Sequence, residues 1–112
     1  MPRIPSIFEK IRKEVLGNSY DLSVAFLSAE EMRKVTKRTK SVDKVSNVLS
    51  FPLSNTSGEI LLCKSAAKPY TVEYLFIHGL LHLKGFKHGA RMDATEEVLL
   101  TQFKLCKKSS QE

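Results

Sequence analysis

Hydrophobic residues along this chain recur with two different periods, and these periods outline its helices and strands. The first amphipathic segment spans residues 6–17. Ser6 and Glu9 have the spacing of a capping box, in which both side chains bond the backbone at the start of a helix. Gly17 is typical of a helix end. The pattern therefore predicts a helix over this segment.

A strand and a second helix are predicted next. Apolar and polar residues alternate over residues 22–26, as in a strand with one buried face. Ser28 and Glu31 form another capping-box pair, and the amphipathic pattern behind them fades near Arg38. The polar, lysine-containing stretch 39–46 predicts a loop.

Two apolar runs, residues 47–53 and 59–63, are separated by a short polar link that contains a glycine. Such a link predicts an antiparallel hairpin. Pro52 cannot donate a backbone hydrogen bond, so its strand is expected to lie at an edge of the sheet.

Two helices are predicted in the last part of the chain. One covers residues 69–83, with Pro69 in its first turn. The other covers residues 93–106, and its apolar positions are Val98, Leu99, Phe103 and Cys106. The predicted order is α-β-α-β-β-α-α. We expect the α+β class, with a small three-stranded mixed sheet packed against about four helices.

The composition favours one domain over residues 1–112, since the apolar fraction of 42% and the charged fraction of 27% are ordinary for a globular protein. Residues 1–6 lack the apolar core of a secretory signal, and no apolar run approaches the length of a bilayer span. We therefore expect a cytoplasmic protein. Cys63 and Cys106 lack a Cys-x-x-Cys partner and are expected to be reduced core residues.

The chain carries a net charge of +6. A positive field raises the encounter rate with polyanions, of which nucleic acid is the commonest in a cytosol. Basic residues gather in and after the second predicted helix: Arg33, Lys34, Lys37, Arg38, Lys40 and Lys44. They form either a solvated helix face or a rim that contacts phosphates.

All three histidines lie within residues 78–88, with the spacing H-x3-H-x2-G-x2-H. On a helix, His78 and His82 share one face, roughly 6 Å apart along the axis. Gly85 can adopt the left-handed conformation that ends a helix, which turns the chain back and brings His88 towards the pair. The spacing predicts a metal site with three imidazole ligands on a zincin-like helix.

Three neutral imidazoles are the ligand set of a catalytic zinc, which keeps a fourth position for water and lowers the pKa of that water. Imidazole also suits nickel. Without an anionic ligand, the ion keeps its full charge and favours an anionic substrate such as a phosphodiester.

Helical zinc proteases place a glutamate directly after the first histidine, whereas this chain has Gly79 there, which argues against peptide hydrolysis. A glycine inside a helix costs about 1 kcal/mol relative to alanine. We therefore expect a substrate, a strand or a packed helix to approach Gly79 closely.

Residues 78–88 closely resemble the H-G-x-L-H-L-x-G-Y-D-H signature of the YbeY family of bacterial rRNA maturation factors. Two further segments fit in the right order. Residues 46–52 resemble the family's T-D-V-L-S-F-P strand, and residues 58–60 resemble its G-D-I strand. The stretch from Met92 to Leu100 is similar to the family's acidic C-terminal helix.

The resemblance implies a zinc-dependent, single-strand-specific endoribonuclease that acts in small-subunit rRNA maturation and ribosome quality control. Its implied partners are single-stranded RNA and the small ribosomal subunit, with no membrane. His78, His82 and His88 would hold one zinc ion per chain. The family arginine that precedes the T-D-V-L-S-F-P strand aligns with Lys40, and Arg38 lies two residues earlier, so either is a candidate phosphate contact.

Lys87 stands where the family signature has an aspartate, and weaker metal binding follows if that aspartate supports the site. This departure favours, as an alternative, an RNA- or ribosome-binding assembly factor with a structural or vestigial zinc. A metallopeptidase is a third hypothesis. In the last predicted helix, Asp93, Glu96 and Glu97 either orient a histidine or complement the dipole at the helix start.

Overall fold

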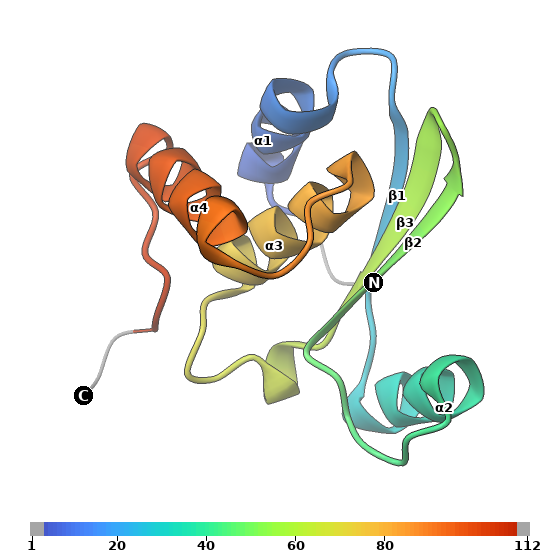
Figure 1. Cartoon of the computed structure of the whole chain (residues 1–112). Helices are drawn as coiled ribbons and strands as arrows, with labels where there is room; N and C mark the ends of the chain where they lie inside the picture. Colours follow the sequence, from blue (N-terminus) through green and yellow to red (C-terminus); the bar gives the residue numbers. More distant parts are fainter. Residues whose placement is uncertain (1–3, 110–112) are drawn as a thin grey trace.

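The computed structural model describes residues 4–109 (Figure 1). The first three residues, on which part of the expectation about a secretory signal rests, lie outside this range, as do residues 110–112. The helices are α1 (Ser6–Leu16), α2 (Ala29–Lys40), α3 (Val72–Lys84) and α4 (Ala90–Gln102), and the strands are β1 (Asp21–Phe26), β2 (Val48–Ser54) and β3 (Ser57–Leu62). A short 3-10 helix (Lys64–Ala66) precedes α3. The predicted element order and the α+β class are confirmed.

The three strands form a mixed sheet in the order β1-β3-β2. The β2–β3 pair is the predicted antiparallel hairpin, and β1 is parallel to β3. The parallel pair requires a crossover, which α2 and β2 supply. Pro52 lies in the edge strand β2, as predicted. An edge strand has a neighbouring strand on one side only, so a residue there can lack a backbone N–H without depriving a second strand of a hydrogen bond.

Each face of the sheet packs against its own helices (Figure 1). Ile60 and Leu62 of β3 point into the larger core, which α1, α3 and α4 complete. Leu61 points to the opposite face and packs in a smaller core with Met32 of α2. Helix α3 contacts the sheet, α1 and α4, so it occupies the centre of the larger layer and fixes the positions of His78 and His82.

The capping box predicted for the first helix is wrong. Helix α1 begins at Ser6 itself, and its N-cap is Pro5, with no side-chain cap. Ser6 is thus one residue too late in the helix to act as its N-cap. The Glu9 carboxylate instead accepts hydrogen bonds from the guanidinium of Arg12. Arg12 also donates to the carbonyl of Gly17 at 2.9 Å, which ties the helix to the turn before β1.

The second capping box is confirmed. Ser28 accepts from the amide of Glu31 at 3.1 Å, and the Glu31 carboxylate accepts from the amide of Ser28 at 2.9 Å. Helix α2 continues to Lys40, two residues beyond the predicted end, and closes at Ser41 with φ 59°. Exposed polar side chains carry the helix this far, so hydrophobic periodicity did not reveal its last turn.

The start of the histidine helix differs from its prediction. Helix α3 begins at Val72, and Thr71 caps it by accepting from the amide of Tyr74. Pro69 therefore precedes the helix and does not lie in its first turn. Thr71 also donates to the carbonyl of Cys106 at 2.6 Å, which joins the start of α3 to the segment after α4.

The last helix lies earlier in the chain than predicted. It ends at Gln102, and Lys104, with φ 56°, reverses the chain. Val98 is 64% exposed, so it is not a core position of this helix. Cys63 is fully buried, as predicted, whereas Cys106 lies beyond the helix and is exposed, so the prediction of a core position is wrong for Cys106. Both are free thiols. Within residues 4–109, no helix is long and apolar enough to cross a membrane.

Candidate metal centre

Helix α3 places two imidazoles one turn apart on the same face. Nε2 of His78 and Nε2 of His82 lie 3.1 Å from each other. The helix then ends at Gly85, which has φ 107°. The amide of Phe86 bonds back to the carbonyl of Leu81 at 2.9 Å, which closes the sharp turn that the glycine predicts.

This turn brings the third histidine to the pair. The His88 ring centroid lies 4.5 Å from that of His82 and 5.1 Å from that of His78. Each ring offers one nitrogen atom, and these three nitrogens all lie within 4.8 Å of one another. The three side chains form a group that could hold a metal ion, as the spacing predicts.

Two oxygen acceptors set the tautomers of the helical pair. Nδ1 of His78 lies 2.6 Å from a carboxylate oxygen of Glu96, and Nδ1 of His82 lies 3.1 Å from the carbonyl oxygen of Phe86. Both acceptors require the Nδ1 proton, so in the neutral rings each Nε2 has a free lone pair. Two facing lone pairs repel unless a cation lies between them. Zinc–nitrogen bonds of about 2.0–2.1 Å in a tetrahedral site separate two ligand nitrogens by about 3.3 Å, close to the spacing found here.

Glu96 is the acidic residue of α4 that reaches the cluster. Its side chain is 2% exposed, and its second oxygen accepts from the hydroxyl of Tyr74 at 3.2 Å. Asp93 and Glu97, the other two candidates, are exposed. Glu96 shares the buried stripe of α4 with hydrophobic residues, and a carboxylate on such a stripe is the sequence signal that distinguishes it from its neighbours.

Burial shifts the pKa values of His82 and Tyr74. Burial lowers the pKa of His82; the carbonyl of Phe86 opposes this shift, while His78 and His88 add to it. Burial and the adjacent Glu96 carboxylate raise the pKa of Tyr74 far above its usual range, so its hydroxyl stays a donor.

The histidines line one wall of an open cleft. The other lining residues are Lys40, Lys44, Asn47, Val48, Leu49 and Ser50, from the end of α2 to the first half of β2. A buried hydrogen bond of 2.8 Å between the hydroxyls of Thr36 and Ser46 anchors the connecting loop. The sheet edge, the loop and α3 together place cationic and polar groups around the imidazoles.

The family sequence model described as Endoribonuclease YbeY matches residues 3–108. The chain belongs to the YbeY family. Endoribonuclease YbeY of Finegoldia magna is 31% identical over 105 residues, covering 79% of this chain and 67% of that protein. Its counterpart in Campylobacter fetus is 34% identical over 98 residues, covering 75% of this chain and 72% of the relative. The solution structure of TM1509 from Thermotoga maritima matches with a TM-score of 0.58 at 26% identity, covering 85% of this chain and 75% of that one.

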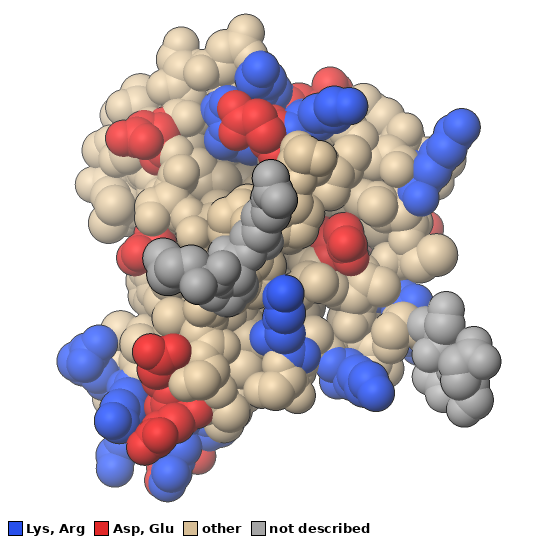
Figure 2. All heavy atoms as spheres, turned by 180° about the vertical axis from the view of Figure 1, so that it is seen from behind, with Lys and Arg blue, Asp and Glu red and all other residues tan. Residues whose placement is uncertain are grey.

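In this YbeY family member, the two candidate phosphate contacts occupy different places. Lys40 lines the cleft beside the histidines, whereas Arg38 is exposed on α2 and is not among the lining residues. Part of the basic run is paired with acids: Arg33 binds Asp43 at 2.6 Å. Figure 2 shows acidic and basic side chains intermingled over α2, so only part of this helix presents free positive charge.

Gly79 has a packing explanation. A Cβ at this position would lie 3.2 Å from Cδ1 of Ile60 and 3.3 Å from Oγ of Ser50. The neighbouring strands β2 and β3 therefore approach the helix closely here, which is one of the expected causes. A glutamate of the protease type would require the side chains of Ile60 and Ser50 to shift.

Proposed function

We propose that this protein is a metal-dependent, single-strand-specific endoribonuclease that acts on small-subunit rRNA in the cytoplasm, in maturation and ribosome quality control. The observation that carries the proposal is the cluster of three imidazoles, whose two helical members aim free lone pairs at one point. The relatives named Endoribonuclease YbeY support the reaction class. We assign the activity to residues 1–112 as one domain, with the small ribosomal subunit as partner.

We further propose that His78, His82 and His88 hold one zinc ion per chain. Neutral nitrogen donors at this spacing suit zinc, and their lack of charge leaves the ion strongly electrophilic. When bound, zinc would supply Lewis acidity at the phosphodiester and lower the pKa of a water molecule.

The chain's own residues prepare this reaction. Glu96 holds the Nδ1 proton of His78, and the carbonyl of Phe86 holds that of His82, so both rings keep a fixed tautomer and orientation. Lys40 at the cleft wall would bind a non-bridging phosphate oxygen and keep the scissile bond near the histidines. Arg38 would act from outside the cleft, as a contact to a more distant phosphate.

Cleavage of end-labelled single-stranded RNA by the zinc-loaded protein tests the proposal. His82→Ala, purified identically, serves as the control, because it removes one of the three proposed metal ligands and leaves the rest of the cleft in place. We expect cleavage by the parent protein, none by the variant, and slower cleavage of the same sequence in a duplex. A strand lacking the 2′-hydroxyl at the scissile site identifies the attacking group, since cleavage that persists there excludes attack by that hydroxyl.

The alternative of an RNA-binding assembly factor makes a different prediction. It requires RNA or ribosome binding that survives removal of the metal, without cleavage. If the parent protein contains zinc and leaves single-stranded RNA intact, the nuclease proposal is wrong and the assembly factor takes its place.

A further inference from the structure

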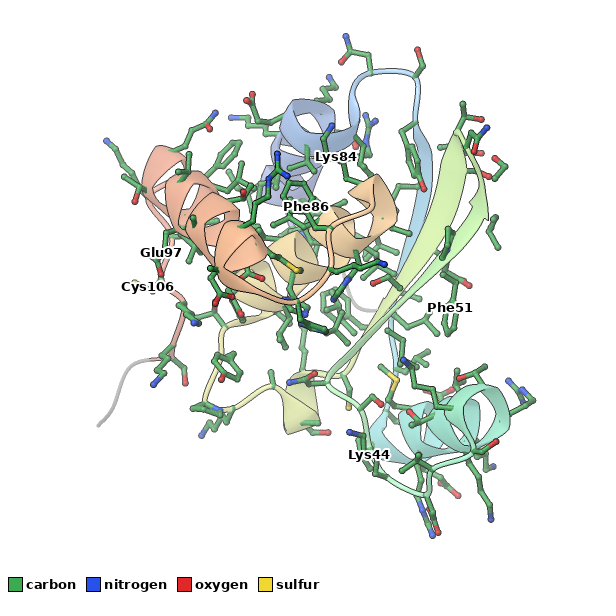
Figure 3. All side chains as sticks on the ribbon, viewed as in Figure 1. Lys44, Phe51, Lys84, Phe86, Glu97 and Cys106 are labelled. Atoms are coloured by element: carbon green, nitrogen blue, oxygen red, sulfur yellow. The ribbon has the colours of Figure 1, made fainter. Side chains whose placement is uncertain are left out.

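A second cleft lies at the turn between α3 and α4, next to the metal centre. It is lined by Lys84, Gly85, Phe86, Lys87 and Arg91. All the charged residues in this lining are basic. Figure 3 shows Lys84 and Phe86 at the end of α3 remote from Lys44, which lies on the α2 side. We call this cleft the turn pocket.

Two of its three cations are free to bind an anion. Nζ of Lys84 donates to the carbonyl of Val15 at 3.0 Å, so this side chain holds α3 against α1. Lys87 and Arg91 are exposed, and within residues 4–109 neither forms an ion pair. Their charges are therefore not neutralised by an acid of the described chain, in contrast to that of Arg33.

The turn pocket also has an apolar wall. Phe86 is half-buried, packs against the larger core and lines the pocket. Its backbone is held in place, because its amide and its carbonyl both form hydrogen bonds in the turn of the metal centre. An aromatic side chain beside two cations can bind a nucleotide, because it offers an apolar surface for the base or ribose while the cations attract the phosphate.

The turn pocket and the histidine cleft meet at neighbouring residues, since Lys87 lines the first and His88 lines the second. Lys87 directly precedes His88, so their Cα atoms are about 3.8 Å apart. Lys40 and Lys44 lie in the histidine cleft, and Lys87 and Arg91 lie in the turn pocket. Both neighbouring clefts therefore have basic residues in their linings.

We propose that the turn pocket is a second binding site for the single-stranded RNA substrate, in which Lys87 and Arg91 bind one or more backbone phosphates and Phe86 supports the nucleotide. The inference rests on the proposed ribonuclease function. The pocket anchors the strand beyond the scissile position and contributes to binding without taking part in bond cleavage.

Binding of the zinc-loaded protein to fluorescent single-stranded RNA of about ten nucleotides, over a series of salt concentrations, tests this site. The test variant is K87A/R91A. The matched control is K10A/K68A, which removes the same charge from exposed positions outside both clefts. Lys87→Arg keeps the charge, and Lys87→Glu reverses it.

We expect K87A/R91A to bind RNA at least tenfold more weakly at low salt, and the control to bind within about twofold of the parent protein. Loss of two phosphate contacts should reduce the slope of log K against log salt by about 1.4. Lys87→Arg should bind like the parent protein and Lys87→Glu more weakly than Lys87→Ala. In cleavage assays the double variant should raise KM and leave kcat within about twofold, because its residues do not touch the reacting bond.

The two proposals fail in distinguishable ways. If the parent protein binds and cleaves RNA while K87A/R91A matches the control in affinity, salt slope and KM, the ribonuclease stands and the second site is overturned. If the parent protein neither binds nor cleaves single-stranded RNA, both proposals are overturned together.

Discussion

A carboxylate oxygen of Glu96 lies 2.6 Å from Nδ1 of His78 and joins α4 to the histidine helix inside the protein. The side chain of Glu96 is almost completely buried, so solvent does not compete for this bond. The contact fixes both the tautomer of His78 and the direction of its free nitrogen. It makes the geometry of the proposed metal site depend on the packing between two helices.

Glu96→Gln should weaken zinc binding by about tenfold to a hundredfold, because the amide is a weaker acceptor for the Nδ1 proton and can rotate to present a donor. Competition with a chromophoric chelator measures this affinity directly, independently of activity. Glu97→Gln removes a carboxylate from the exposed side of the same helix and should leave the affinity unchanged. Equal affinities in the two variants would show that Glu96 does not position the histidine.

Lys40→Ala should lower kcat/KM for RNA cleavage by about tenfold or more, because a charged hydrogen bond to phosphate contributes about 1.5–3 kcal/mol. Arg38→Ala removes a neighbouring cation that does not line the cleft, and its effect should be smaller and mostly abolished by salt. The measurement is initial cleavage rate at subsaturating RNA. A larger loss in the arginine variant would transfer the phosphate-binding role to Arg38.

Gly79→Ala should reduce the free energy of unfolding by up to about 2 kcal/mol, because crowding against buried Ile60 outweighs the gain in helix propensity. Ile60→Val removes the Cδ1 atom that the new methyl group would meet. Urea unfolding of both single variants and the double variant measures their coupling. We expect the double variant to be more stable than the sum of the two single effects predicts, whereas strict additivity would contradict this contact.

Two serines with the same sequence signature should differ in their effect on stability. Ser28→Ala should reduce the free energy of unfolding by about 1 kcal/mol, because it removes a side-chain cap. Ser6→Ala should have almost no effect, since that serine caps nothing. Thermal or urea unfolding of the two variants provides the comparison, and a similar loss in both would mean that α1 is capped by its serine after all.

The metal-free protein should lose stability on acidification. Burial lowers the folded-state pKa of His82, so the unfolded chain binds more protons at this side chain. The resulting stability is fully present above the unfolded pKa of about 6.5 and decreases as the pH falls through the lower folded value. Urea unfolding at about pH 7.5 and about pH 5.5 should show this decrease, and His82→Asn should reduce it. An unchanged pH dependence in the variant would exclude His82 as its source.

The sequence by itself determined the order of helices and strands and the grouping of the histidines. Periodicity, capping and turn formation depend on residues a few positions apart, so the second capping box and the reversal at Gly85 were both predictable. The residues at which the helices begin and end were less predictable. The pattern at Ser6 and Glu9 did not form a cap, because the helix begins at Ser6 itself and Pro5 occupies the N-cap position.

Only the tertiary structure decided which distant side chains surround the histidines. Three of these contacts join different elements. His78 meets Glu96, Lys40 lies in the histidine cleft, and Ile60 packs closely against Gly79. Such contacts depend on how helices and strands pack, to within a fraction of a helix turn. The sequence could name three acidic candidates in α4, but burial and packing selected one of them, because local periodicity does not set the distance and angle between two helices.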